Sequence, residues 1–518
     1  MTLLERKEAG GAPWPAPPEP SLAVGRREQV VFSGGAFLIT LAMSLATIGR
    51  QALWHDEALT ARAVDMDWMS LVQDRLAAGH FPTYFAFLKA IGLSHASDVA
   101  LRMPSALAAS GAAAIFASIA LSLGGRLAAT ATALLFAFLP VLFYYSQEAR
   151  PYALMLFFLA LATAGQIKIV TGRLDEGRPG LVATIGTLGA ALVIPAGIVS
   201  VAAQQIALLS TGAASRSRAG RRIVLRHLLV TWVTIGTAAT SLLPSAILAS
   251  KEPGGLMKWQ MGMRPSSRIS VAWHDVFGVT VKYDIDRFLP AHFEIVPSFA
   301  FAALMIAGAW FGRRQMAIRY LSLTVAATAL CFVAVGSVTA ITARYLLGIV
   351  PPAILLVAFA SARLVAVRRR RWIVAPLLAI AMGMIMLQGL DAAFSDTRYD
   401  SREPAAFIRA MGLGNAEIIT NSNLAAMPLA RYLPVGMTPK IRAPLPPVDS
   451  PDLIWTWARE TPNAYLLLFG SGIAIPAEAF AGRQVCSWRF GRATFFVLAH
   501  DPQSLPAPLR GCAGRMTP

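Results

Sequence analysis

The sequence predicts a polytopic α-helical membrane protein with a small α/β domain at its C-terminal end. Hydrophobic residues make up 56% of the 518-residue chain and charged residues only 14%, with a mean hydropathy of +0.56. Apolar runs of about 18 or more residues recur from Val30 to Leu390, which is long enough for helices that cross a bilayer. A membrane β-barrel would instead show alternating segments of about ten residues.

The basic residues of the chain follow the positive-inside pattern. The net charge is +18, and arginines gather in short connectors between apolar runs, at 216–226, 313–319 and 368–371. Such clusters orient helices against the cytoplasmic leaflet, so they indicate a lipid bilayer as partner and argue against nucleic acid. We therefore expect a bacterial inner (plasma) membrane protein with a cytoplasmic N-terminus.

The first half of the chain divides by this rule into a tail and six crossings. Residues 1–29 are Pro-rich and polar and predict a disordered cytoplasmic tail. The first span is expected at about Val30 to Ile48, followed by a periplasmic loop at 49–98. The next spans are expected at about 99–123, 127–145 and 151–170. The run 181–210 has basic flanks at both ends, which predicts two short helices that meet near Pro195.

The second half continues with five more spans, which keep every arginine cluster on the cytoplasmic side. They are expected at about 227–248, 296–311, 320–340, 345–364 and 372–390. The membrane domain then covers 30–390, with about eleven crossings and a large periplasmic loop at 249–294.

The last segment, 391–518, changes to a mixed polar composition and is expected to fold as a periplasmic α/β domain. A helix is predicted at Glu403–Met411, and AEIIT, AYLLLF and RATFFVLA resemble buried strands. Cys486 and Cys512 lie here; in an oxidising compartment they could pair, although the sequence does not give their separation. Cys331 falls inside a span, where a small packing role is simplest.

Polar residues collect at the periplasmic ends of the spans. The acidic pair of WHDEA, Asp56 and Glu57, precedes LTARAVDMDWMSLVQDRLAAG, which predicts one amphipathic surface helix that ends at Gly79. HFPTYFAFLKAIGLS is too short to span and predicts a second surface helix. Charges at membrane depth are costly and often mark a site, while a single interfacial charge can be merely solvated. A carboxylate here suits general-base work on a hydroxyl, or hydrogen bonding to a sugar.

Two arginine motifs lie at the same boundary. YYSQEARPY and TARYLLGIVPP contain Arg150 and Arg344, flanked by Tyr145, Tyr152 and Tyr345. A guanidinium fork suits the phosphate of a lipid carrier, although arginine and aromatic residues also anchor helices at interfaces. A shared site requires the Asp56 carboxyl to face the same cavity as both guanidinium groups.

The order of these motifs resembles the GT-C polyprenyl-phosphate-sugar glycosyltransferases. The resemblance covers about residues 30–365 and includes HFPTYF, LRMPSAL, SQEARPYAL and ARYLLGIVPP. In the order of its motifs the chain most resembles bacterial lipid A aminoarabinose and galacturonic acid transferases, and more distantly protein O-mannosyltransferases. The resemblance implies a cell-envelope glycosyltransferase of the hexosyl or pentosyl type. Such an enzyme moves a sugar from a polyprenyl phosphate to a periplasmic glycolipid, polysaccharide or protein and inverts the anomeric centre of the sugar.

The resemblance also assigns roles to single residues. Asp56 matches the essential acidic residue, acting as base or orienting the acceptor, and Glu57 is its usual partner. The donor and its phosphate would be bound by a set drawn from three motifs: His80, Tyr84, Arg150, Tyr152, Arg344 and Tyr345. Phe81 departs from the usual proline, LVIPAGIVS replaces an aromatic or His-containing motif, and DEALT lacks the Arg and Tyr of some lipid A enzymes. The acceptor therefore stays open.

Several alternatives remain at this point. A divalent metal is open, since Asp56, Glu57, His80 and His274 offer ligands, although their spacing follows no known code. No Gly-rich nucleotide loop occurs, consistent with a lipid-linked donor. A lipid or polysaccharide transporter or flippase would place polar residues deep in several spans, and an assembly factor would need no reactive carboxylate. The loop 249–294, with Trp259 and Trp273, is expected to shape acceptor choice.

Overall fold

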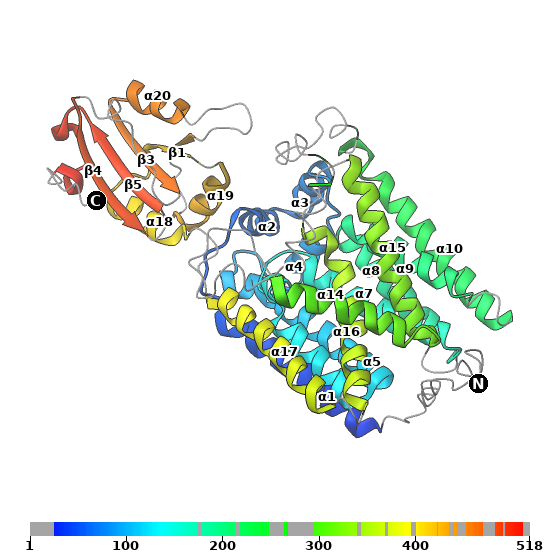
Figure 1. Ribbon diagram of the computed structural model, residues 1–518. Coiled ribbons are helices and arrows are strands. Elements are labelled where there is room, and N and C mark those ends of the chain that lie inside the picture. Colours follow the sequence, from blue (N-terminus) through cyan, green and yellow to red (C-terminus); the bar gives the residue numbers. More distant parts are fainter. Residues whose placement is uncertain are drawn as a thin grey trace, which may run out of the picture.

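The computed structural model consists of a bundle of apolar helices with an α/β domain at one end (Figure 1). It describes residues 25–174, 178–212, 218–245, 247, 264, 266–267, 295–338, 343–367, 371–394, 400–421, 423–434, 437, 440–442, 452–469, 482–490 and 493–510. The fold class expected from the sequence is confirmed. The tail residues 1–24 and most of the loop 249–294, including Trp259, Trp273 and His274, lie outside the described residues.

Within the described part of the chain, seven helices are long and apolar enough to cross a membrane. They are α1 (Arg26–Thr47), α5 (Asp98–Phe138), α7 (Tyr152–Val170), α10 (Arg218–Thr240), α15 (Met316–Val338), α16 (Val350–Ala366) with the 3₁₀ turn η5 (Ala343–Ile349) before it, and α17 (Arg371–Phe394). Three shorter apolar helices are α8 (Pro179–Val193), α9 (Ala196–Ser210) and α14 (Ile295–Phe311). The expected number of about eleven crossings stays a prediction.

The long element α5 consists of two legs that fold back on each other. Its backbone leaves the helical region at Gly125, where φ is +73° and ψ is −164°. Arg126 pairs with Glu28 at the start of α1, whereas Arg102 donates to the carbonyl of Ile48 just past the end of α1. The chain therefore crosses the bundle, turns at a glycine that tolerates positive φ, and returns. This matches the two spans expected at 99–123 and 127–145.

The expected break near Pro195 is confirmed. α8 ends at Val193 and α9 begins at Ala196, and Ile194 between them has an extended backbone. The turn is tight: a Cβ added at Gly197 would lie 2.0 Å from the carbonyl oxygen of Ala190. The short surface helix α4 (Thr83–Ala90) covers this turn, since the hydroxyl of Thr83 donates to the carbonyl of Leu192.

The surface segment after the first span differs from expectation. The single amphipathic helix expected before Gly79 is wrong, because two helices form: α2 (His55–Asp65) and α3 (Trp68–Ala77). The cause is Asp67, whose side chain accepts a hydrogen bond from the backbone N–H of Ser70 at 3.0 Å and caps α3. The expected end at Gly79 holds, with φ of +74°.

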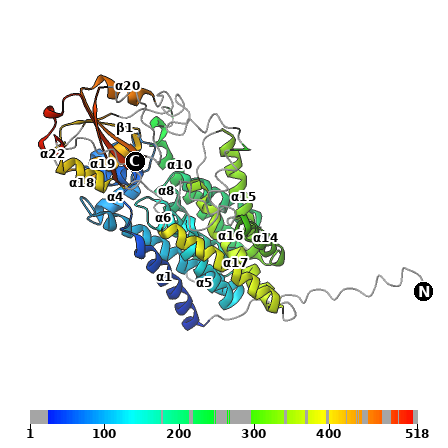
Figure 2. The same ribbon diagram turned by 60° about the vertical axis from the view of Figure 1, so that its left-hand side comes forward.

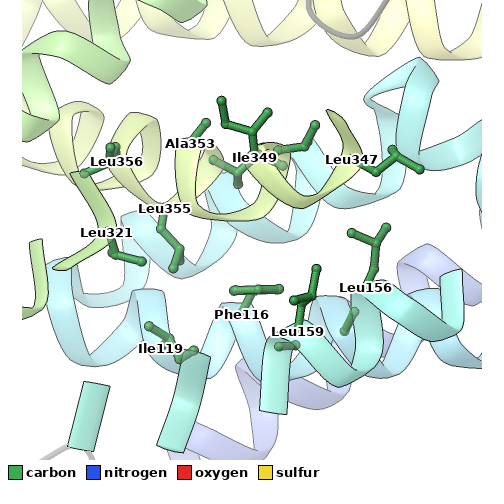
Figure 3. Packing of buried hydrophobic residues seen from close by; sticks show 14 of the residues in the cluster. Phe116, Ile119, Leu156, Leu159, Leu321, Leu347, Ile349, Ala353, Leu355 and Leu356 are labelled. Atoms are coloured by element: carbon green, nitrogen blue, oxygen red, sulfur yellow. The ribbon is translucent and has the colours of Figure 1, made fainter. Parts of the chain in front are cut away.

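The main core lies between α5, α7, α15, α16 and η5 (Figure 3). Leu347 and Ile349 bring η5 into this core, so the turn that carries Arg344 is anchored by buried neighbours. In Figure 3, Leu355 of α16 points toward Phe116 and Ile119 of α5. The other labelled residues of the same cluster are Leu156, Leu159, Leu321, Leu347, Ile349, Ala353 and Leu356.

The C-terminal domain contains a five-stranded sheet in the order β2-β1-β3-β5-β4. Its strands are β1 (Glu417–Thr420), β2 (Lys440–Arg442), β3 (Asn463–Phe469), β4 (Gln484–Phe490) and β5 (Ala493–Ala499). β1 is parallel to β2 and β3, and β5 is antiparallel to β3 and β4. The helices are α18 (Arg402–Ala410), α19 (Asn423–Tyr432), α20 (Asp452–Glu460) and the short η6 (Pro502–Ser504) and α22 (Ala507–Arg510).

The predicted elements of this domain are confirmed. The helix expected at Glu403–Met411 is α18, and the three expected strands are β1, β3 and β5. β2 and β4 were not expected from the sequence. Cys486 in β4 is disulfide-bonded, whereas its expected partner, Cys512, lies outside the described residues. Cys331 is a free thiol in α15.

A neutral polar network joins five helices near the end of the bundle away from α2. His227 of α10 bonds to Gln205 of α9 at 2.8 Å and to the hydroxyl of Thr184 of α8 at 2.9 Å. Gln166 of α7 lies 3.4 Å from the His227 ring, and its carbonyl accepts from the hydroxyl of Tyr320 of α15 at 2.6 Å. Such hydrogen bonds hold helices together where water does not reach.

Candidate active site

The Asp56 carboxylate meets two guanidinium groups at the end of the bundle that faces the C-terminal domain. Arg344 donates from Nη1 to Oδ2 of Asp56 at 2.7 Å, and Nη2 of Arg150 lies 3.7 Å from the same oxygen. The three groups come from α2, η5 and the turn before α7, separated by up to 288 residues in sequence. The grouping on which the sequence hypothesis depends is therefore present in the structure.

Local structure places Asp56 in the first turn of α2, which begins at His55. A carboxylate is favoured there because the unpaired N–H groups give the helix N-terminus a partial positive charge. Thr60, one turn later, donates its hydroxyl to the carbonyl of Asp56 at 3.1 Å. Arg150 contacts the same turn, with Nη1 3.4 Å from the carbonyl of Asp56 and 3.5 Å from the hydroxyl of Thr60.

Asp56 is only partly enclosed. Its side chain is 18% exposed and that of Arg344 is 23% exposed, while Arg150 is 6% exposed. Burial raises the pKa of Asp56, but the charges of Arg150 and Arg344 outweigh it and hold the pKa below its ordinary value. The carboxylate is thus ionised at neutral pH, and an incoming molecule can reach both it and Arg344.

Glu57 stands in a different environment from Asp56. Its side chain is 0% exposed and forms a bidentate salt bridge with Arg102 of α5. Nε of Arg102 donates to Oε1 at 2.8 Å, and Nη2 donates to Oε2 at 2.7 Å. The backbone N–H of Ala149 also donates to Oε1 at 2.8 Å. Arg102 in turn donates to the carbonyls of Ile48, Gln51 and Ala52. Glu57 therefore ties α2 to α5 and to the turn that carries Arg150.

His80 and Tyr84 flank the charged group. His80 lies in the field of Arg150, Arg75 and Asp56; burial, followed by the arginine charges, lowers its pKa to about 4. The imidazole is neutral at pH 7 and can either donate or accept a hydrogen bond. Tyr84 is fully buried beside Ser105, and burial raises the pKa of its phenol. Its side chain belongs to the core between α2, α3 and α4.

The remaining expected residues are aromatic neighbours of the arginines. The guanidinium of Arg344 lies over the ring of Tyr345, 5.8 Å from its centroid, within cation–π range. Tyr152 is buried at the start of α7 and packs edge-on against Tyr145, with ring centroids 4.9 Å apart. The phenol of Tyr152 lies in the electrostatic field of Arg344 and Arg150, and a role of Tyr152 and Tyr345 in binding the donor stays a prediction.

The described residues contain no group of three or more His, Cys, Asp or Glu side chains arranged to hold a metal ion. Asp56 and Glu57 point to different partners, since one pairs with Arg344 and the other with Arg102. His274, the fourth ligand considered from the sequence, lies outside the described residues. Within the described part of the chain, the charged side chains that meet at Asp56 are its own carboxylate and two guanidinium groups.

Sequence reasoning missed two contributors to this site. Thr60 carries only the weak signal of lying four residues after Asp56 on the same helix face. Tyr432, in α19, accepts a hydrogen bond from the backbone N–H of Leu53, and no sequence pattern links residues so far apart. Arg102 lies in the LRMPSAL motif, but the sequence did not indicate its pairing with Glu57.

Comparison with known proteins gives distant structural likeness. The sequence matches no family model and no curated protein. The structure is similar to ArnT from Cupriavidus metallidurans bound to undecaprenyl phosphate, with 13% identity, 90% of this chain and 97% of that chain covered, and a TM-score of 0.49. The apo form of that ArnT gives 14% identity, coverage of 94% and 99%, and a TM-score of 0.48.

A second neighbour is the mycobacterial arabinofuranosyltransferase AftD, with 15% identity and a TM-score of 0.43. The alignment covers 92% of this chain and 42% of that one. The identities to these structures are too low to assign a role to any single residue of this chain.

Proposed function

We propose that this protein is a membrane glycosyltransferase that moves a sugar from a polyprenyl phosphate carrier to an acceptor at the same face of the bilayer. The single observation that carries the proposal is the contact of one partly exposed carboxylate, Asp56, with two arginines at the end of an apolar bundle. Displacement of a lipid phosphate needs a proton acceptor near the incoming hydroxyl and cations on the leaving group.

The proposed reaction is a single displacement. The acceptor hydroxyl attacks the anomeric carbon of the sugar from the side opposite the phosphate, and its proton passes to the Asp56 carboxylate. The bond between the anomeric carbon and the phosphate oxygen breaks, and the electron pair leaves with the polyprenyl phosphate. Attack from the opposite side inverts the anomeric centre.

The arginines are assigned to the phosphate. Arg344 is the more exposed of the two, and its guanidinium lies over the ring of Tyr345, 5.8 Å from the ring centroid. A phosphate dianion offers several oxygens to such a planar fork, and the two cations together stabilise the charge of the leaving group. Because Arg344 already touches Asp56, phosphate and carboxylate would share it during the reaction.

The other expected residues take supporting roles in this proposal. Glu57 positions α2 and the Arg150 turn, rather than receiving a proton, since its oxygens accept from Arg102 and Ala149. The neutral imidazole of His80 forms a hydrogen bond to the sugar donor or to the acceptor molecule. Tyr84 supports His80 from the core. Tyr152 and Tyr345 shape the phosphate pocket. The site faces the periplasm of the inner membrane if the arginine-rich connectors lie in the cytoplasm.

The test is mass spectrometry of envelope glycolipids, polysaccharides and glycoproteins from cells with the gene, without it, and with Asp56→Asn. One sugar-bearing product is expected to vanish on deletion and to fall about 10²–10⁴-fold with Asp56→Asn. The matched control is Glu28→Gln, which changes an exposed carboxylate at the opposite end of the bundle. A product that persists at the wild-type level in Asp56→Asn cells, with the protein in the membrane, would refute the proposal.

A further inference from the structure

The C-terminal domain contacts the segment that carries Asp56. In Figure 1, α19 of that domain lies beside α2 at the end of the helical bundle, and the turned view of Figure 2 also shows the domain at that end. Two neighbouring residues near the end of α19, Arg431 and Tyr432, make polar contacts to this segment. A third contact comes from Arg402 of α18, which donates to the carbonyls of Gly49 and Arg50 at 3.2 and 2.6 Å.

Tyr432 binds the chain just before α2 begins. Its hydroxyl accepts a hydrogen bond from the backbone N–H of Leu53 at 2.7 Å and donates to Oδ2 of Asp98 at 2.7 Å. Leu53 is fully buried and directly precedes Trp54, the residue that caps α2. Asp98 begins α5, the helix that also carries Arg102. One hydroxyl thus joins the starts of two helices that hold the site.

Arg431 binds the other end of α2. Nη1 lies 3.2 Å from Oδ2 of Asp65, the last residue of α2, and Nη2 donates to the carbonyl of Ala96 at 2.7 Å. Adjacent residues of α19 therefore contact both ends of the eleven-residue helix α2. Asp56 lies between these two contacts, three residues after Leu53.

We propose that Tyr432 is a positioning residue: by fixing the start of α2, it keeps the Asp56 carboxylate between Arg150 and Arg344. The proposal rests on the proposed function, because it gives the C-terminal domain a part in that reaction. It explains why a phenol is present at this point. The buried N–H of Leu53 donates to the hydroxyl of Tyr432 in the C-terminal domain. A buried N–H without an acceptor would lower the free energy of unfolding.

The effect of losing this contact follows from geometry. Tyr432→Phe keeps the ring and its packing but removes both hydrogen bonds. The start of α2 is then held by fewer contacts, and displacements of about 1 Å at a reacting group can cost up to 10²-fold in rate. We expect about a tenfold loss, because Glu57 and Arg102 still hold α2 from its other side.

Hydrogen–deuterium exchange of the purified full-length protein gives a readout that does not need activity. In Tyr432→Phe, amides of 50–60 are expected to exchange at least several-fold faster, while those of β3 and β5 stay as in the wild type. The matched control is Tyr465→Phe, the same change in β3 of the same domain, which should leave 50–60 unaffected. Unchanged exchange at 50–60 in Tyr432→Phe would overturn the proposal.

The in-cell product assay supplies the second arm. Tyr432→Phe should lower the product about tenfold at an unchanged protein level, and Asp98→Asn, which keeps an oxygen acceptor for the phenol, should keep most of it. Wild-type product from Tyr432→Phe would refute the positioning role. If the Asp56→Asn strain in the same assay still makes product, the proposed function fails, whereas the exchange data still decide whether Tyr432 holds α2.

Discussion

The two polar regions of the bundle differ in charge. Near α2, Asp56, Arg150 and Arg344 are ionised groups in contact, and two of them are partly exposed. At the other end, His227 and Gln205 belong to a neutral network whose hydroxyls, amides and imidazole bond to one another. The two regions lie at opposite ends of α7, which begins at Tyr152 and contains Gln166 near its end.

This difference suggests that the ionised group near α2 has a functional role, whereas the neutral network around His227 contributes to helix packing. Neutral polar groups that satisfy each other stabilise helix contacts modestly, by about 0.6 kcal/mol per hydrogen bond on average in a membrane protein. Ionised groups inside an apolar bundle are costly, and such groups usually mark a site of function. A transporter would need polar groups that line a path for its substrate through the bundle. The neutral polar network around His227 instead joins helices α7, α8, α9, α10 and α15 to one another.

The largest effect on the fold is expected from the buried ion pair. Arg102→Met leaves the Glu57 carboxylate buried without its cation, and breaking a buried pair in this way costs about 3–5 kcal/mol. The matched control is Arg126→Met on the same helix α5, where the pair with Glu28 is exposed and contributes little. Thermal unfolding in detergent measures both. Equal unfolding temperatures for the two variants would contradict the structural role of Arg102.

The next effect concerns Arg344 and pH. Arg344→Gln removes one cation from the proposed leaving-group site, and loss of one such donor typically costs about 10²–10³ in rate. It also removes a charge that lowers the pKa of Asp56, so that pKa rises and the carboxylate is protonated at a higher pH. Below that pH the base is lost.

Product formation in isolated membranes from pH 4 to 8 checks this. The acid limb of the profile should lie at a higher pH in Arg344→Gln than in the wild type. Arg363→Gln, at the far end of α16 where the arginine contacts the ring of Phe359, is the control and should leave the profile unchanged. An acid limb at the same pH in Arg344→Gln would show that Arg344 does not act on Asp56.

The smallest effect is expected from the neutral network. His227→Leu removes its bonds to Gln205 and Thr184, so the free energy of unfolding should fall by about 1–2 kcal/mol while the envelope product stays at the wild-type level. Unfolding in detergent and the mass-spectrometric assay measure the two quantities. Loss of product at a normal protein level would instead place His227 on a functional path and favour the transporter alternative.

The bundle could be predicted from the sequence better than the site. Long apolar runs and arginine clusters determine the spans, and basic flanks with Pro195 indicate the α8–α9 turn, because these signals are local. The break between α2 and α3 could have been found from Asp67, an N-capping residue. Local patterns do not reveal which of two adjacent carboxylates is enclosed: Glu57 and Asp56 differ through Arg102 and Arg344, which tertiary packing brings to them.

The central claim is that Asp56, Arg150 and Arg344 form one site for a lipid phosphate. A cryo-electron microscopy structure of the full-length protein with undecaprenyl phosphate tests it most directly. The account predicts phosphate density within hydrogen-bond distance of both guanidinium groups, with the Asp56 carboxylate on the same side. Phosphate bound elsewhere, with Arg344 still closed on Asp56, would contradict it.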